Sequence, residues 1–231
     1  MDRFRQFAEN YRLIHDTNLK NTGYTSSYFA ERKIKEIVKH TKCATAKKLK
    51  ILDLGCGDGL GVFYFRKYFP RAFIIGLDIC EKSIKIALKR SIHNTEFRIY
   101  DGKKIPFNKG TFDIILLAGL LHHLADRKHR LNILKECYRV LKTESNLFIF
   151  EHNPYNPITC RIVHRCIFDK DVSMINFLEV KKMLKEVGFE ARFRFIIFLP
   201  GFLKAIECLE NLVWWIPLGG QYYSIARKST G

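Results

Sequence analysis

Patterns that mark several classes of protein are missing from this chain of 231 residues. Its seven cysteines contain no C-x-x-C pair. An odd, irregularly spaced set of cysteines in a chain that shows no export signal predicts reduced, buried thiols in the cytoplasm rather than a disulfide framework. No group of residues has the spacing of metal ligands, so we expect no bound metal.

The chain also lacks a long uninterrupted apolar run. No such run follows the N-terminal charged residues, so we expect no signal peptide. The most apolar late stretch, residues 195–218, is too interrupted to predict a spanning helix. It predicts core packing, or alternatively a lid over an apolar substrate or a surface that leans on a membrane. The interrupting residues are Pro200, Lys204, Glu207, Glu210 and Pro217.

Acidic residues are scarce. The chain has 23 Asp and Glu against 40 Lys and Arg, which gives a formal net charge of +17. Such a charge is compatible with a nucleic acid, an anionic membrane or an anionic substrate as partner. The lysines are spread along the chain, so a generally lysine-rich composition is an equally good interpretation, and the charge alone does not choose a partner.

Residues 51–59, which read Ile-Leu-Asp-Leu-Gly-Cys-Gly-Asp-Gly, form the most informative stretch of the chain. An apolar strand leads into Asp53, and three alternating glycines follow at positions 55, 57 and 59. Glycine has no Cβ and adopts positive φ at little cost, so this turn lets a ligand approach the backbone closely.

The letters around this turn do not fit a dinucleotide-binding turn. The fingerprint G-x-G-x-x-G requires glycine at position 60 or 62, where the chain has Leu60 and Val62. The Asp53 carboxylate beside the turn disfavours a pyrophosphate and suits a ligand with a cationic or hydroxyl-bearing end. The motif therefore favours S-adenosylmethionine over a dinucleotide.

Strand-like and helix-like segments alternate through the middle of the chain, which predicts crossover connections and a mostly parallel sheet. After residue 151 a Pro-containing loop and a short basic segment lead to elements that finish the sheet and cover one end of it. The expected strands are 50–54, 72–77, 96–100, 111–117, 146–150, 189–197 and 221–226, and the expected helices are 27–40, 60–69, 81–90, 128–141, 177–187 and 201–215.

The carboxyl ends of these strands should carry the chemistry, because ligands of an open α/β sheet bind there. Asp78 follows the second strand, where a carboxylate can accept hydrogen bonds from both ribose hydroxyls. Asp101 and Gly102 follow the third strand, placed to accept from an adenine amino group. Ala118 and Gly119 follow the fourth strand and leave room for a sulfonium centre.

With these motifs the chain resembles class I S-adenosylmethionine-dependent methyltransferases of the small-molecule, type 11/12 kind. The resemblance covers roughly residues 50–151. The matching motifs are residues 51–59, Gly-Leu-Asp at 76–78, Tyr-Asp-Gly at 100–102, Ile-Pro-Phe at 105–107, Thr-Phe-Asp-Ile at 111–114, Leu-His-His-Leu at 121–124 and Arg-Val-Leu-Lys at 139–142. One departure, Lys-Thr-Glu-Ser at 142–145 where Lys-Pro-Gly-Gly is usual, affects a surface turn only.

The resemblance implies a Rossmann-like three-layer α/β/α sandwich with a seven-stranded, mostly parallel sheet and an antiparallel last strand. We expect an N-terminal helical cap segment over 1–48 and a methyltransferase domain over 49–231, with 152–215 including a cover on the substrate side.

The resemblance also implies S-adenosyl-L-methionine as cofactor and S-adenosyl-L-homocysteine as its product. Asp53 and the glycines would then hold the methionine moiety, Asp78 the ribose and Asp101 the adenine. The full set of expected cofactor-binding residues is Asp53, Gly55, Cys56, Gly57, Gly59, Asp78, Ile79, Asp101, Gly102, Ala118 and Gly119.

The methyl acceptor is less well determined. If the nucleophile is a hydroxyl, a base must remove its proton, and histidine suits this role near neutral pH. His122 and His123 follow the fourth strand, and His152 follows the fifth. Glu151 could orient a histidine or the substrate. These four are the catalytic candidates, with a structural or cofactor-lining role for the paired histidines as the alternative.

We therefore expect a cytoplasmic methyltransferase that acts on a small molecule, more at oxygen than at nitrogen or carbon, with an apolar or lipid-linked acceptor and peripheral membrane contact left open. An RNA methyltransferase is the competing enzyme, although no RNA-binding appendage is recognisable. A non-catalytic cofactor-binding scaffold is the third alternative. The sequence does not indicate an oligomeric state.

Overall fold

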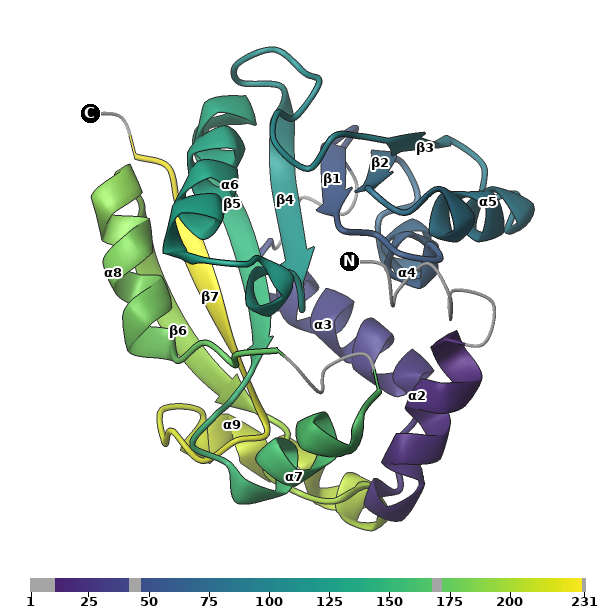
Figure 1. Ribbon diagram of the computed structural model, residues 1–231, viewed down its shortest axis with the longest axis vertical. Helices are drawn as coiled ribbons and strands as arrows, with labels where there is room; N and C mark the ends of the chain where they lie inside the picture. Colours follow the sequence, from purple (N-terminus) through teal and green to yellow (C-terminus); the bar gives the residue numbers. More distant parts are fainter. Residues whose placement is uncertain (1–10, 42–46, 168–171, 230–231) are drawn as a thin grey trace.

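The computed structural model describes residues 11–41, 47–167 and 172–229, and a seven-stranded sheet forms its centre (Figure 1). The strand order is β3-β2-β1-β4-β5-β7-β6. The first five strands in this order, β3, β2, β1, β4 and β5, pair in parallel with their neighbours. Strand β7 pairs antiparallel with both β5 and β6. This confirms the predicted sheet with its antiparallel last strand. The strands are β1 (Lys50–Leu54), β2 (Phe73–Asp78), β3 (Thr95–Ile99), β4 (Phe112–Ala118), β5 (Leu141–His152), β6 (Glu190–Ile196) and β7 (Gln221–Arg227).

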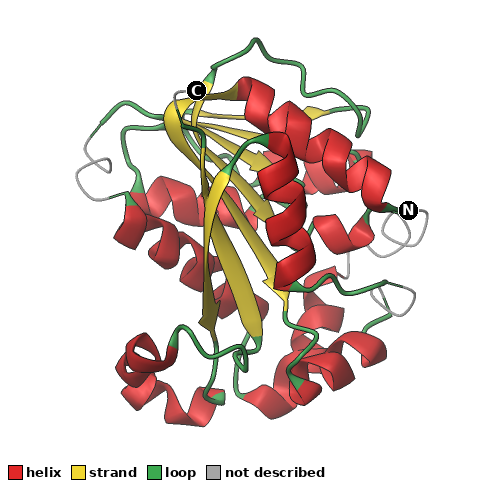
Figure 2. Ribbon diagram, turned by 90° about the vertical axis from the view of Figure 1, so that its left-hand side faces the viewer, coloured by secondary structure: helices red, strands yellow, loops and turns green. Residues whose placement is uncertain are grey.

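Helices cover both faces of the sheet, which makes the predicted three layers (Figure 2). The central strands are buried on both faces, as their nearly continuous apolar sequences require. One core contains apolar side chains of α3, α4 and α5, and the other contains those of α6 and α8. These helices are α3 (Ser26–His40), α4 (Leu60–Tyr68), α5 (Glu81–Lys89), α6 (Arg127–Val140) and α8 (Phe177–Val187).

Two helices are absent from the helix ranges expected from the sequence pattern, although the first of them falls within the expected helical cap segment over 1–48. One is α2 (Tyr11–Leu19), close to the N-terminus. The other is α7 (Pro157–Arg165), in the stretch interpreted as a loop and a basic segment. The Asn156 side chain caps α7 by accepting from the Thr159 N–H at 2.9 Å, and Pro157 occupies its first turn. Proline at this position supports a helix start, because its missing N–H would be unpaired there anyway.

The prediction of one continuous apolar helix over 201–215 was wrong. The segment folds as η3 (Gly201–Leu209), a run of 3₁₀ turns, followed by the short α9 (Glu210–Val213). Leu203 and Ile206 have non-helical backbone angles and interrupt the helix. An apolar composition predicted a buried helix, but most of this segment is exposed.

Several expected absences can be compared with the described part of the chain. None of its helices is long and apolar enough to cross a membrane. Its His, Cys, Asp and Glu side chains form no group of three or more that could hold a metal ion. No two of the six described cysteines form a disulfide with each other. Most are buried as predicted, but Cys208 is exposed, and Cys43 lies outside the described residues.

Candidate active site

The glycine turn after β1 has the backbone conformation that its sequence predicts. Gly55, Gly57 and Gly59 have φ values of 80°, 53° and 79°, in the left-handed region that favours glycine. Asp78, at the end of β2, fixes the turn: its Oδ2 accepts the Gly57 N–H at 2.8 Å, and its Oδ1 accepts the Cys80 N–H at 2.8 Å. Burial raises the pKa of Asp78, while these backbone hydrogen bonds oppose the shift.

Asp53 is a buried carboxylate, 3% exposed, that lies beneath the same turn. Within residues 11–41, 47–167 and 172–229 it accepts no hydrogen bond and forms no ion pair. A Cβ built on Gly61 would lie 2.5 Å from Asp53 Oδ2, so only glycine leaves space for this carboxylate. Burial and then the charge of Asp78 raise the pKa of Asp53 to about 7, against the opposing effect of Lys33.

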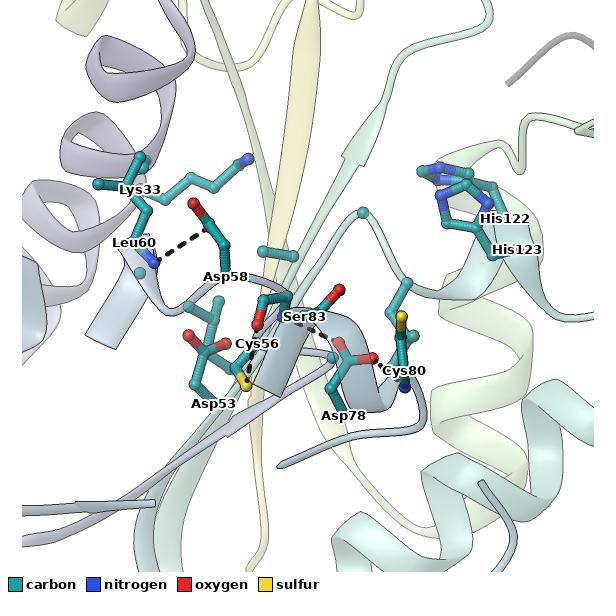
Figure 3. A pocket seen from close by; sticks show the side chains of 18 of the residues that line it. Lys33, Asp53, Cys56, Asp58, Leu60, Asp78, Cys80, Ser83, His122 and His123 are labelled. Carbon is teal, nitrogen blue, oxygen red and sulfur yellow. Dashed lines mark hydrogen bonds between the residues drawn. The ribbon is translucent and has the colours of Figure 1, made fainter. Parts of the chain in front are cut away.

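A cavity of about 710 Å³ opens beside these carboxylates. Its walls come from the glycine turn, the ends of β2 and β4, the loop after β4, and the N-terminal helices α2 and α3. Figure 3 shows the two carboxylates on one side and the histidine pair on the other. The predicted site residues that line the cavity are Asp53, Gly55, Cys56, Gly57, Asp78, Ile79, Ala118, Gly119, His122 and His123.

Five predicted site residues lie outside the lining of this cavity: Gly59, Asp101, Gly102, Glu151 and His152. Gly59 packs beneath the turn, where a Cβ would lie 2.9 Å from the Phe97 ring. The Asp101 carboxylate is exposed, and its Oδ1 accepts the N–H groups of residues 103 and 104 at 2.8 and 2.9 Å. These hydrogen bonds lower the pKa of Asp101.

His122 and Glu151 form a buried pair at the end of the cavity away from the glycine turn. His122 Nδ1 is hydrogen-bonded to Glu151 Oε2, and Glu151 Oε1 accepts the Leu121 N–H at 2.8 Å. A carboxylate accepts hydrogen bonds, so the Nδ1–H of His122 is the donor in this pair. Glu151 therefore orients the histidine, which is one of the two roles considered for it.

The other two histidines stand next to this pair. The ring centroid of His123 is 4.2 Å from that of His122, and that of His152 is 5.4 Å from it. Burial, and then the charge of His122, hold the pKa values of His123 and His152 well below the ordinary value. Both rings are therefore neutral at pH 7. Of these two rings, His123 lines the cavity and His152 does not.

The structure adds cationic residues that the motifs did not predict. Lys33 extends from α3 into the cavity (Figure 3), and the described residues offer its ammonium no ion pair. Burial lowers the pKa of Lys33 to about 8, while the charges of Glu151 and Asp53 oppose this shift. No local sequence motif indicates that Lys33 belongs to the site, because its position depends on how α3 packs against the sheet.

Arg12 of α2 is the second added cation. Its guanidinium pairs with Asp58 of the glycine turn, with Nε 2.7 Å from Oδ2. Arg90 donates to the same carboxylate at 2.6 Å. Burial alone would raise the pKa of Asp58, but the hydrogen bonds and charges of the two arginines lower it overall. The ion pairs of Asp58 with Arg12 and Arg90 hold α2 against the turn, so α2 forms part of the cavity wall.

Comparisons with known proteins agree on one family. Residues 52–149 match the model of the "Methyltransferase domain" family. A demethylmenaquinone methyltransferase of Thermotoga maritima is 32% identical over 220 residues, which cover 84% of this chain and 90% of the relative. A probable tRNA methyltransferase 9B of Bos taurus is 31% identical over 100 residues, which cover 43% of this chain but only 20% of that protein.

The fold comparison gives the same result. A SAM-dependent methyltransferase of Archaeoglobus fulgidus superposes with a TM-score of 0.68 at 18% sequence identity, covering 88% of this chain and 95% of the other. At this identity the likeness concerns the fold. The extent of the Thermotoga match settles the family, and S-adenosylmethionine is accordingly the cofactor. The chain belongs to the class I S-adenosylmethionine-dependent methyltransferases.

Proposed function

We propose that this enzyme methylates a small, largely apolar acceptor that carries an acidic hydroxyl group, and that His122 removes the hydroxyl proton. The observation that carries the proposal is His122 in the wall of the cofactor cavity, with its Nδ1 hydrogen-bonded to Glu151 behind it. Leu120, Leu124 and Ala125 line the cavity close to this pair and offer an apolar surface for the acceptor.

The cavity fits the cofactor on the side of the glycine turn. The unpaired Asp53 carboxylate suits the ammonium of the methionine moiety, and Lys33 suits its carboxylate. A Cβ built on Gly57 would meet no protein atom within 4 Å, so the backbone is open to a ligand there. Asp78 uses one lone pair of each oxygen on the turn and keeps acceptor capacity for ribose hydroxyls. Asp101 remains a candidate for the adenine, because only its Oδ1 is occupied.

When bound, S-adenosylmethionine supplies an activated methyl group and leaves as S-adenosylhomocysteine. His122 Nε2 takes up the hydroxyl proton as the acceptor becomes nucleophilic, and Glu151 stabilises the imidazolium through Nδ1–H. Ala118 and Gly119 leave space for alignment of the acceptor with the methyl group, which is the main source of catalysis in such a displacement.

Removal of the hydroxyl proton can lead either to an O-methylated or to a C-methylated product. A deprotonated ring hydroxyl attacks through oxygen, or through a conjugated ring carbon. We propose oxygen as the site of methylation. The name of the Thermotoga relative, demethylmenaquinone methyltransferase, supports a quinone-type acceptor and makes the ring carbon the principal alternative.

The test uses the purified full chain, isotopically labelled S-adenosylmethionine and naphthohydroquinone as a probe acceptor. We expect labelled methyl in the organic extract, and its position on oxygen or carbon follows from the NMR spectrum of the product. The dimethyl ether of the same probe is the matched control and should remain unlabelled, because it has no hydroxyl proton to lose. Equal labelling of both compounds would contradict a role for proton removal.

RNA is a second candidate acceptor, favoured by the net charge of +17 and by the partial match to the tRNA methyltransferase relative. Incubation of the enzyme with total RNA separates the two proposals. Label that appears in RNA, is lost at high salt and is absent from organic extracts would replace the small-molecule proposal. Tight cofactor binding without methyl transfer to either fraction would support the scaffold alternative.

A further inference from the structure

Residues 202–218 present an apolar surface to solvent at one end of the molecule. Phe202 is 80% exposed, Leu212 71% and Trp215 64%. Single exposed apolar residues are ordinary, but a concentration of them in one segment marks an interaction surface. We call this surface the apolar face; its exposed large apolar residues are Phe202, Leu203, Ile206, Leu209, Leu212, Trp214, Trp215 and Leu218.

The acidic residues of this segment are turned away from the apolar face. Glu207 and Glu210 are the only acids between residues 199 and 220, and both pair with Arg32 of α3. Glu210 is also buried and accepts the Phe198 N–H at 2.7 Å. The outer side of the segment therefore carries neither of its two carboxylates.

Basic residues flank the apolar face on the side of α7. The Asn156 side chain at the start of α7 donates to the Leu218 carbonyl at 2.7 Å, which places the helix beside the end of the apolar face. Arg161 and Arg165 of α7 are exposed, and residues 153–167 contain no acid. Figure 1 shows α7 and α9 together at the bottom of the molecule.

The apolar face is joined to the helices that wall the active-site cavity. The Tyr24 hydroxyl, between α2 and α3, donates to the Leu199 carbonyl at 2.8 Å. A Cβ built on Gly201 would lie 2.3 Å from the Gly23 carbonyl oxygen, so the two backbones are in close contact. Lys20 is exposed in the same turn and adds a basic residue on this side.

We propose that the apolar face docks on an anionic lipid surface. Its leucine, isoleucine and phenylalanine side chains enter the acyl boundary, and Trp214 and Trp215 lie at the level of the headgroups, where tryptophan is favoured. Arg161, Arg165 and Lys20 then face lipid phosphates, and such basic residues strengthen binding to anionic membranes. The proposal is independent of the acceptor proposed above, because lipid binding requires neither cofactor nor acceptor.

A lipid surface fits this face better than a second copy of the chain. A symmetric dimer places the same patch of both subunits together. The basic flanks of the two copies would then meet, and each copy carries a net charge of +17. Like charges in contact oppose association, whereas an anionic surface pairs with the same residues.

Vesicle flotation with the full chain tests the proposal. The vesicles consist of phosphatidylcholine, with or without phosphatidylglycerol, and no cofactor is added. We expect flotation with the anionic vesicles, weaker flotation with neutral ones, and release at high salt, because salt screens exposed charges. The combined variant Leu212→Ser and Trp215→Ser should lower the partition coefficient by about tenfold or more, since each substitution removes a large apolar side chain from the contact.

The matched control is the combined variant Leu88→Ser and Ile99→Ser, which changes two exposed apolar residues of α5 and β3 and should float like the parent chain. Arg161→Gln with Arg165→Gln should reduce binding to anionic vesicles only. A normal thermal shift with S-adenosylhomocysteine confirms that each variant is folded. The proposal is overturned if the parent chain does not float, if both apolar variants bind alike, or if light scattering shows a dimer that Leu212→Ser and Trp215→Ser dissociate.

Discussion

At the scale of single residues, Asp53 carries a conflict between stability and binding. Ionising a buried carboxylate without a protein partner costs free energy, and this cost raises the pKa of Asp53 to about 7. A site for a cationic ligand has a reason to keep such a group, because an incoming ammonium supplies the ion pair that the described residues do not. Functional sites commonly hold this kind of local instability.

Asp53→Asn should separate the two effects. The pKa of Asp53 lies above the unfolded value near 3.8, so the folded ligand-free chain loses stability as the pH rises from about 4 through 7. The variant has no ionised group there, and its melting temperature at pH 8 should exceed that of the parent by at least about 2 °C. The gain should shrink at pH 5. Calorimetry should show S-adenosylmethionine binding weakened by about tenfold or more. A less stable variant with unchanged affinity would contradict this assignment.

Glu151→Gln tests the role of the buried pair. It removes the charge that orients His122 and stabilises its imidazolium, so we expect kcat to fall by about 10²–10⁴. Glu151 does not line the cavity, and the Kd for S-adenosylhomocysteine should stay unchanged. His152→Gln is the matched control, since that ring stands 5.4 Å from His122 and outside the lining, and it should lower kcat much less. An equal loss in both variants, with intact melting curves, would argue for a structural role of the cluster.

Lys33 should make cofactor binding depend on pH. Its pKa in the ligand-free chain is about 8, so the ammonium that we propose as partner of the cofactor carboxylate loses its charge as the pH rises above this value, and the affinity should fall. The α-amino group of the ligand also titrates near about 8. Calorimetry on Lys33→Arg isolates the lysine, because arginine stays charged. Between pH 8 and 10 the affinity of this variant should fall less than that of the parent. Identical curves would exclude Lys33 as the carboxylate partner.

At the scale of elements, the sequence predicted the strands and their carboxyl ends well. Asp53 and Asp78 stand at the carboxyl ends of apolar strands, and parallel strands bring these ends to the same edge of a sheet, so both residues line the cavity. Asp101 follows the same rule but lies at the edge strand β3, where its carboxylate caps the next turn.

Residues on helices far from the motifs could not be assigned to the site in this way. Lys33 reaches the cavity because α3 packs Ile34 and Ile37 into the core, and Lys33 lies one turn before Ile37 on the same face of the helix. Arg12 depends on α2, whose residues show no strong helical pattern. The interrupted form of η3 depends on tertiary contacts, since Glu207 of η3 and Glu210 of α9 both turn inward to Arg32.

Arg32 joins α3 to η3 and α9, and Arg32→Met should show how much this link contributes. The side chain is buried and pairs with Glu36, Glu207 and Glu210. Its loss removes the ion-pair partner that the described residues give Glu207 and Glu210, whereas Glu36 keeps Lys39, and we expect the free energy of unfolding in urea to fall by about 3–5 kcal/mol.

Lys35→Met on the same helix is the control for Arg32→Met. Lys35 is exposed and pairs with Glu31 at 3.7 Å, so its loss should cost about 0–1 kcal/mol. If the two variants had similar stability, α3 and η3 would not be joined by this charge cluster.

At the scale of the whole molecule, the active site is a composite of two parts of the chain. The strand ends supply the carboxylates, the loop after β4 supplies the histidine pair, and α2 and α3 supply Arg12 and Lys33 on the other wall. The Arg12–Asp58 pair connects the two parts. A ligand held between them binds only when α2 is in place, so binding should stabilise this helix more than distant ones.

Hydrogen exchange measured by mass spectrometry tests this coupling. At about 100 times its Kd, S-adenosylhomocysteine should slow exchange in α2 by up to about 100-fold if local opening of the helix releases the ligand. Exchange in α8, which packs on the far side of the sheet from α3, should change little. Arg12→Met should speed exchange in α2 before ligand is added, because it removes the contact with Asp58. Unchanged exchange in α2 with saturating ligand would show that the wall formed by α2 does not depend on the bound cofactor.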